Sequence, residues 1–392
     1  MDSIRDPRRI TLLAGLGAVL GLLAGGAAWL LVKLIGLITN LTLFGRVATE
    51  LPVMSTLQPS PRIVIVAVGG ALVVAVLAKW SPVIKGHGIP EAMESILQRQ
   101  SRVAPRTAVA KPVSAALAIG TGGPFGAEGP IIVTGGSLGS LLGQVLDVSP
   151  SERKILLACG AAGGMAATFG APMASIVLAV ELLLFEFSTR AFIPLAVATS
   201  VAGGVHNAVF GDGPLFTAPD FAFAGLADLP VFIPLGLLSG LAAVVVAKGL
   251  FLVEAGFRRL PISEFWHPAI GALGFATIGL MVPEVLGVGY DVIDGVLADE
   301  YAVDALVVLS VAKLVAWWLA LGSGTSGGHP GSRPVDLRGI RGDRGSCHLV
   351  PVPRGRHRPR GLRLGGDGGD LRRRHAGDAH VDRLRVRIDS GV

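Results

Sequence analysis

The sequence has little charge and almost no cysteine. Only 16% of its 392 residues are charged, against about 25% in ordinary soluble domains. It has two cysteines, Cys159 in an apolar stretch and Cys347 in an arginine-rich one. We therefore expect neither a disulfide framework nor a metal site. The low charge argues against an ordinary soluble domain.

Most of the chain also lacks net charge, although the formal total is +6. Residues 329–392 contain fifteen arginines, seven aspartates and neither lysine nor glutamate, a net charge of +8. Residues 1–328 therefore carry a net charge of −2. A nearly neutral body predicts no nucleic-acid partner, because such partners require clustered positive charge.

Apolar residues make up 51% of the chain, and the mean hydropathy is +0.63. A full membrane crossing needs about 20 apolar residues. Several of the apolar stretches are shorter or contain Gly and Pro, so we expect tilted helices and half-crossings among them. The first stretch is too long for a cleaved signal peptide. The pattern predicts an all-α polytopic membrane protein, multi-pass in the cell membrane, with helices near Ile10–Ile38, Ile63–Leu77, Ile131–Leu146, Ile155–Phe169, Met173–Phe187, Phe192–Val209, Val231–Val253, Ile270–Leu286 and Ala302–Leu321.

Glycines recur four residues apart within these stretches. Small residues at that spacing let helix backbones approach closely in lipid, where no hydrophobic force drives helices together. Glycine is common in membrane helices, but repeated sets favour a tightly packed bundle. The sets are Gly17, Gly21 and Gly25; Gly135, Gly139 and Gly143; and Gly160 with Gly164.

Basic residues outside the apolar stretches indicate the orientation. Residues 1–9 contain three arginines, and residues 98–111 contain Arg99, Arg102, Arg106 and Lys111. Short loops rich in Lys and Arg stay in the cytoplasm, so both segments are predicted to be cytoplasmic loops. The expected organisation is a cytoplasmic N-terminus over 1–9, a transmembrane domain over 10–328 and a tail over 329–392.

Three glycine-rich segments interrupt the apolar pattern: KGHGIPE at 85–91, GAEGP at 126–130 and TSGG at 325–328. The first two lead into a helix start. A helix start exposes unpaired N–H groups and a partial positive charge, so it binds anions. Several such ends converging at mid-membrane would hold a bare anion without any full positive charge. A plain turn is the alternative for each segment.

Glu128 is the single charge in GGPFGAEGP, residues 122–130. A carboxylate inside a membrane is costly and usually functional. At a helix start it can occupy an anion site when ionised and leave that site when protonated or displaced. We predict that Glu128 is a gate; a simple helix cap is the alternative.

GHGIP, GAEGP and FGAPMASIVLAVE at 169–181 together resemble the CLC family of chloride channels and proton-coupled chloride transporters, whose motifs include GSGIP and G(K/R)EGP. The resemblance runs from about residue 10 to residue 328. It implies a homodimer with one anion pathway per subunit, built from inverted repeats of tilted, broken helices. It also implies a voltage-gated-type chloride channel or chloride/proton antiporter, not an enzyme, in contact with membrane lipid and with no cofactor beyond the transported chloride.

By the same resemblance Glu128 is the gating glutamate. The residues that would bind the anion are those of the three glycine-rich segments: Gly86, His87, Gly88, Ile89, Pro90, Gly126, Ala127, Glu128, Gly129, Pro130, Gly327 and Gly328.

Departures from the family pattern leave the transport mode open. His87 replaces a serine whose hydroxyl contacts the anion, and Ala127 replaces the usual Lys or Arg. Leu182 stands where many transporters carry an internal proton-transferring glutamate. Glu181 and Glu186 are the remaining candidates for a proton path, and a helix-end position is the alternative reading of Glu186.

Two other function classes stay open. A secondary transporter of another anion would also use broken helices, but it should place an Arg or several polar groups at mid-membrane. An intramembrane serine protease could be read from the GTSG sequence at 324–327. That reading needs a histidine on a following helix to activate the serine, and no apolar helix follows. We interpret His206 and His267 as structural.

Hydrophobic periodicity stops after residue 328. We interpret residues 329–392 as the product of a reading-frame shift in a GC-rich gene; a disordered basic tail that binds anionic lipid or nucleic acid is the alternative. A possible coding of residues 329–333, read one base later, gives Ile-Leu-Ala-Pro, the continuation typical of the family. The chain would then lack the remaining part of the anion pathway.

Resequencing the gene around codon 328 tests this interpretation. We expect an inserted or deleted base there, followed by apolar helices in the alternative frame. A single open frame through residue 392, together with a function that depends on the tail in the native host, would contradict it.

Overall fold

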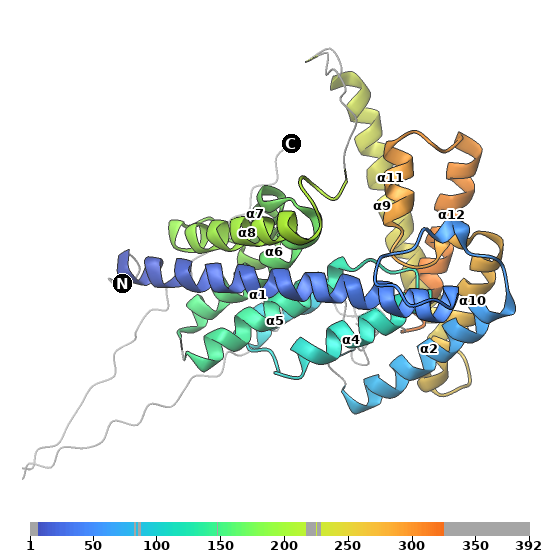
Figure 1. Cartoon of the computed structure of the whole chain (residues 1–392), viewed down its shortest axis with the longest axis horizontal. Coiled ribbons are helices and arrows are strands. Elements are labelled where there is room, and N and C mark those ends of the chain that lie inside the picture. Colours follow the sequence, from blue (N-terminus) through green and yellow to red (C-terminus); the bar gives the residue numbers. More distant parts are fainter. Residues whose placement is uncertain are drawn as a thin grey trace, which may run out of the picture. The chain divides into compact units, whose positions relative to one another are not determined.

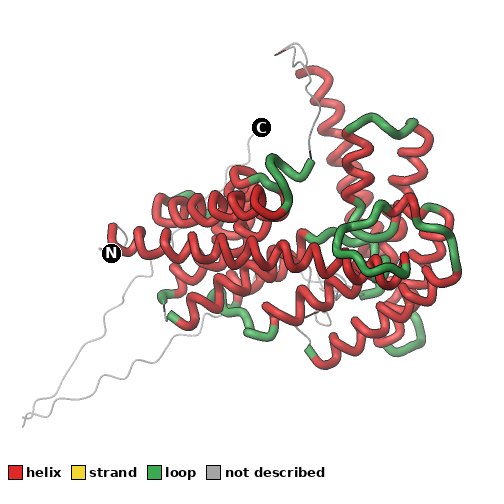
Figure 2. The backbone as a smooth tube through the Cα atoms, in the orientation of Figure 1, coloured by secondary structure: helices red, strands yellow, loops and turns green. Residues whose placement is uncertain are grey.

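The apolar stretches form helices throughout the part of the chain that the structure describes (Figures 1 and 2). This computed structural model describes residues 7–81, 84, 88–146, 148–216, 225 and 229–324, which all belong to one compact unit, Met1–Ser332. The α-helices are α1 (Pro7–Thr39), α2 (Pro61–Trp80), α3 (Gly88–Gln98), α4 (Thr107–Gly120), α5 (Glu128–Val145), α6 (Pro150–Phe169), α7 (Pro172–Ala179), α8 (Thr189–Val209), α9 (Leu229–Arg258), α10 (His267–Met281), α11 (Tyr290–Leu297) and α12 (Val303–Gly322).

Each of the nine predicted apolar stretches coincides with a helix to within a few residues, and no strand occurs among the described residues. Short turns extend three of these helices: η2 (Asn40–Phe44) after α1, η5 (Val180–Leu184) after α7 and η8 (Pro283–Val285) after α10. Five helical spans are long and apolar enough to cross a membrane. They are Pro7–Phe44, Pro61–Trp80, Thr189–Val209, Pro230–Arg258 and Val303–Gly322.

The predicted loop over 98–111 is too long at its C-terminal end. Residues 99–106 connect α3 to α4, but α4 begins at Thr107 and carries Lys111 as a buried residue. The prediction counted charges along the sequence, and a lysine in a buried ion pair looks the same as one in a loop. Lys111 pairs with Glu91, which lies 20 residues earlier, so no local pattern reveals the pair.

The predicted close helix packing is confirmed. In α5, a Cβ added at Gly135 or Gly139 would clash with a backbone carbonyl of α6, and one at Gly160 of α6 would clash with α5. In α1, a Cβ at Gly17 would lie 2.6 Å from a carbonyl oxygen of α8, and one at Gly21 would also clash with α8. The backbones of α5 and α6 are therefore in contact, and so are those of α1 and α8, as small residues permit.

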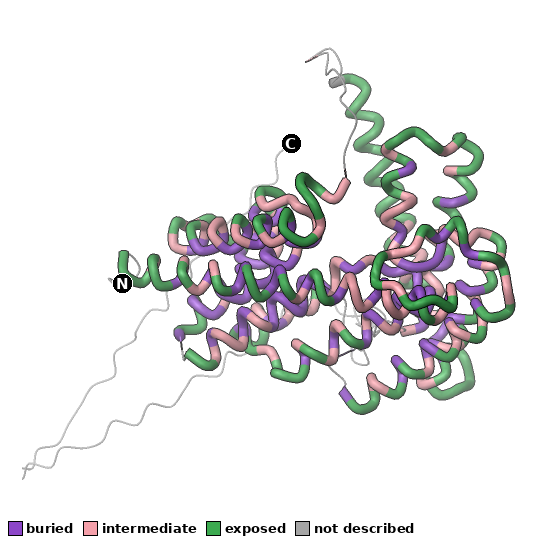
Figure 3. Tube along the Cα trace, viewed as in Figure 1, coloured by how far each residue is buried: buried purple, intermediate pink, exposed green. Residues whose placement is uncertain are grey.

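The buried residues form two apolar clusters, seen as the interior positions in Figure 3. One lies among α5, α6, α7, α8 and the first half of α1. The other lies among α2, α10, α12, the end of α4 and the second half of α1. Because α1 contributes to both, this helix of 33 residues joins the two clusters.

A charged cluster closes one end of the bundle. Glu152, in the first turn of α6, accepts hydrogen bonds from Ser149 in a capping box and pairs with Arg9 of α1 and Arg190 of α8. The neighbouring Arg153 donates to a carbonyl of the segment after α3. Arg9 and Gln100, which belong to the two basic segments predicted to be cytoplasmic, thus lie at the same end, as one orientation in the membrane requires.

The ionised carboxylate of Glu152 should stabilise the fold in a pH-dependent way. Burial would raise its pKa, but hydrogen bonds from Ser149 and the guanidinium groups of Arg9 and Arg190 hold the pKa below its ordinary value of 4.5. A lowered folded-state pKa means that the stabilisation is present above about pH 4.5 and is lost as pH falls through the folded-state pKa. At pH 7, Glu152→Gln should cost about 1.5–3 kcal/mol of unfolding free energy, the range for hydrogen bonds to charged groups.

Thermal unfolding of the purified chain in detergent, at several pH values, measures this effect. The matched control is Glu94→Gln, which removes a more exposed ion pair to Arg99 and should change stability by less than about 1 kcal/mol. Equal losses in the two variants, or an unchanged pH profile in Glu152→Gln, would contradict the assignment.

Candidate anion site

Two helix starts meet in the interior of the chain. Gly88 begins α3 and Glu128 begins α5. Gly88 has φ +47°, and a Cβ there would lie 2.7 Å from the Cα of Gly129. Only glycine tolerates both the left-handed backbone and this approach. The segments GHGIP and GAEGP, which lie about 40 residues apart in sequence, are therefore brought together at their helix starts.

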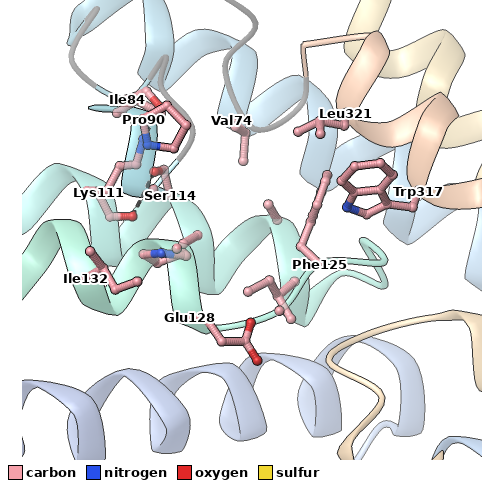
Figure 4. A pocket seen from close by; sticks show the side chains of 17 residues that line it. Val74, Ile84, Pro90, Lys111, Ser114, Phe125, Glu128, Ile132, Trp317 and Leu321 are labelled. Carbon is pink, nitrogen blue, oxygen red and sulfur yellow. Dashed lines mark hydrogen bonds between the residues drawn. The ribbon is translucent and has the colours of Figure 1, made fainter. Parts of the chain in front are cut away.

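A cavity of about 330 Å³ lies beside this junction (Figure 4). Its polar wall comes from the starts of α3 and α5 and from two side chains of α4, Lys111 and Ser114. Its apolar wall includes Val74 of α2, Phe125 before α5 and Trp317 of α12. The volume is ample for a small anion with some of its water.

The start of α5 offers N–H groups and partial positive charge to this cavity. The residue before the helix, Ala127, has helical dihedrals, and its side chain gives no capping hydrogen bond. The first N–H groups of a helix have no partner within the helix, and the helix dipole adds about half a positive charge there. Gly129 and Pro130 in this first turn line the cavity, so an anion in it would face the helix start.

The carboxylate of Glu128 lies back over Gly126, where an added Cβ would overlap it. It points away from Lys111 and Ser114 (Figure 4). On that side, Glu128 Oε1 accepts a hydrogen bond from the hydroxyl of Tyr290 at 3.4 Å. The carboxylate is thus held beside the α5 start and leaves the cavity open. Sequence reasoning missed Tyr290, because nothing near it in sequence relates it to a residue 162 positions earlier.

Full positive charges accompany the helix starts, contrary to our expectation of a site without them. Lys111 is a cavity-lining residue whose Nζ lies 2.8 Å from Glu91 Oε2 and donates to the carbonyl of Ile84 at 3.0 Å. Lys313 of α12 donates to two carbonyls after α10, at 2.7 and 3.2 Å, and interacts electrostatically with Glu128. Sequence reasoning missed Lys313 as well, because a single lysine in an apolar helix has no local signature.

Four of the predicted anion-binding residues, Gly86, His87, Gly327 and Gly328, lie outside the described residues. Ile89 and Pro90 stand in the first turn of α3, and Pro90 lines the cavity.

The two candidates for a proton path, Glu181 and Glu186, are exposed at the far end of α7, and neither lines the cavity. The turn that ends α7 contacts Lys154 of α6, whereas the start of α5 lies against Gly164 of the same helix. Ten residues of helix separate these points, which is about 15 Å. The structure does not bring these glutamates together with Glu128.

The two histidines interpreted as structural lie away from the cavity. His206 is buried, with its ring nitrogens 2.7 and 3.0 Å from the carbonyl oxygens of Ala167 and Gly213. His267 begins α10 and packs against Phe257. Both positions are consistent with the structural interpretation.

Comparison with known proteins decides the family. The family model described as voltage gated chloride channel matches residues 69–330, more than half of the chain. The chain belongs to the voltage-gated chloride channel family. The resemblance seen in GHGIP and GAEGP is thereby confirmed, and together with the spanning helices it makes the chain a multi-pass membrane protein.

Named relatives of this family include channels and exchangers. A putative chloride channel protein ClcB-like from Ralstonia nicotianae is 29% identical over 274 residues, 68% of this chain and 63% of that protein. The H(+)/Cl(-) exchange transporter ClcA of Vibrio campbellii is 32% identical over 261 residues, 64% of this chain and 55% of that protein. The chain thus spans less than two thirds of the length of these relatives.

Solved structures share the fold. A slow cyanobacterial Cl-/H+ antiporter matches with a TM-score of 0.65 at 23% identity, over 82% of this chain and 75% of that one. A CLC-type fluoride/proton antiporter matches with a TM-score of 0.66 at 20% identity, over 82% and 78%. The predicted all-α, CLC-like arrangement of broken helices is therefore confirmed.

Proposed function

We propose that the chain moves chloride, or a similar small anion, across the membrane through the cavity beside the starts of α3 and α5. The observation that carries this proposal is the contact of Gly88 with Gly129, which aims two helix starts at one cavity. Each start supplies N–H groups and partial positive charge without a mobile side chain. Such a site replaces part of the water around an anion and still lets the anion leave.

Glu128 acts as the gate in this proposal. Its carboxylate stands at the α5 start, where a permeant anion would also be stabilised, and the Tyr290 hydroxyl holds it to one side. Rotation of the side chain toward the cavity would place a negative charge in the anion path. Protonation would remove that charge, so external pH and anion concentration would both control opening.

Passive conduction fits the described residues better than proton-coupled exchange. Among the described residues that line the cavity, Glu128 is the one carboxylate, and Glu181 and Glu186 lie exposed elsewhere. Chloride/proton antiport, the activity named for the Vibrio relative, is the second candidate. We also propose a homodimer, as the family resemblance implies.

Chloride efflux from liposomes that contain the purified full chain tests the proposal. Glu128→Gln keeps the shape of the side chain and removes its charge. We expect efflux at neutral pH to rise about tenfold, which corresponds to a barrier lower by roughly 1.4 kcal/mol. Its dependence on external pH should disappear. Glu94→Gln, which does not line the cavity, should behave as the unmodified chain.

Simultaneous recording of proton movement separates the two transport modes. Efflux that carries no protons supports passive conduction, and a fixed proton-to-chloride ratio supports antiport. A Glu128→Gln variant that keeps the full pH dependence of efflux would contradict the gate.

A further inference from the structure

The ion pair between Lys111 and Glu91 is placed asymmetrically about the cavity. Lys111 lines the cavity on the α4 side. Glu91 is absent from that lining and instead faces a separate small cleft between α3, α5 and α6, where it lies beside Ser95 and Ser137. The pair therefore presents its positive end to the cavity and holds its negative end behind the wall.

Lys111 of this pair is buried and Glu91 is partly buried. Their side chains are 5% and 19% exposed, and their charged atoms lie 2.8 Å apart. The carbonyl of Ile84 also accepts a hydrogen bond from Lys111 Nζ, which fixes the ammonium at the wall. Buried ion pairs can often be replaced by apolar residues without loss of stability. Charges inside a membrane protein commonly mark an ion path.

We propose that Lys111 is a fixed counter-charge for the anion in the cavity, and that Glu91 weakens its field and so sets the anion affinity. This inference rests on the proposed function and names the side chains that tune it. Lys111 acts through space, because the hydrogen bonds of its ammonium hold it to the wall. At an effective dielectric of about 20, a unit charge about 12 Å away changes the affinity for an anion about tenfold.

The opposing charge of Glu91 has a functional reason. Conduction requires binding that is favourable enough for entry and weak enough for release. A lysine at the wall without a neighbouring carboxylate would bind a small monovalent anion too tightly for rapid release. With no charged side chain at the wall, the helix starts alone would have to compensate for the water that the anion loses. A lysine with a carboxylate behind it gives an intermediate field. The departure at Ala127, which lacks the positive side chain usual in the family, makes this field more important here.

A purely structural role for the pair is the competing explanation, since it links α3 to α4. Two variants distinguish the explanations by the sign of their effect. Glu91→Gln keeps an oxygen that can accept the Lys111 hydrogen bond and removes only the opposing charge. Lys111→Met combined with Glu91→Gln removes both charges, leaves no unpaired ion and keeps similar side-chain volumes.

Isothermal titration calorimetry with chloride measures the affinity of the full chain in detergent, after exchange into a buffer with a large organic anion. We expect Glu91→Gln to bind chloride about tenfold more tightly, as a unit charge about 12 Å away predicts at an effective dielectric of about 20. The double variant should bind chloride about twofold more weakly, because removing two opposite charges changes the field at the anion less than removing one. Glu94→Gln, one turn further along α3 and outside the cavity wall, should match the unmodified chain.

Opposite shifts in the two variants would support the proposal. Weaker binding in both, or unchanged binding in Glu91→Gln, would overturn it in favour of a structural role, with thermal unfolding showing whether each variant is folded. A folded, unmodified chain that neither binds nor transports chloride would contradict the proposed function itself.

Discussion

The contact between Gly88 and Gly129 is the constraint on which the site depends. No side chain separates the two helix starts, and the positive φ of Gly88 turns the chain into α3 at the point of contact. Glycines likewise let the backbone of α5 contact that of α6, and the backbone of α1 contact that of α8. Close backbone packing therefore does two things here. It holds helices together in lipid, where burial of apolar surface does not drive helix association, and it points two helix starts at one cavity.

The cavity combines partial and full charges of opposite sign. Helix starts and Lys111 make its polar wall positive, and Glu128 is the carboxylate among the described residues that line it. The hydroxyl of Tyr290 donates a hydrogen bond to the carboxylate, and the charge of Lys313 interacts with it electrostatically. In the proposed function, these groups divide into a fixed field, which attracts an anion, and a side-chain charge, which competes with it. Gating would then need rotation of one side chain and no large movement of the backbone.

The sequence predicted the helices and the two helix starts, because long apolar runs and glycine-rich breaks are local signals. It did not predict the partners of Lys111, Tyr290 or Lys313, because each pairing depends on the packing of helices far apart in sequence. Lys111 shows the difficulty most clearly. Its charge made residues 98–111 look like a loop, whereas the buried carboxylate of Glu91 lets it sit within α4.

The central claim is that a small anion binds where α3 and α5 begin. Diffraction at the bromine absorption edge, from crystals of the full chain in bromide, tests it most directly because bromide replaces chloride and is located by its anomalous signal. The account predicts an anomalous peak inside the cavity, within hydrogen-bonding reach of the first turn of α5 and on the side of Lys111. A clear anomalous signal elsewhere in the protein with none in this cavity would contradict it.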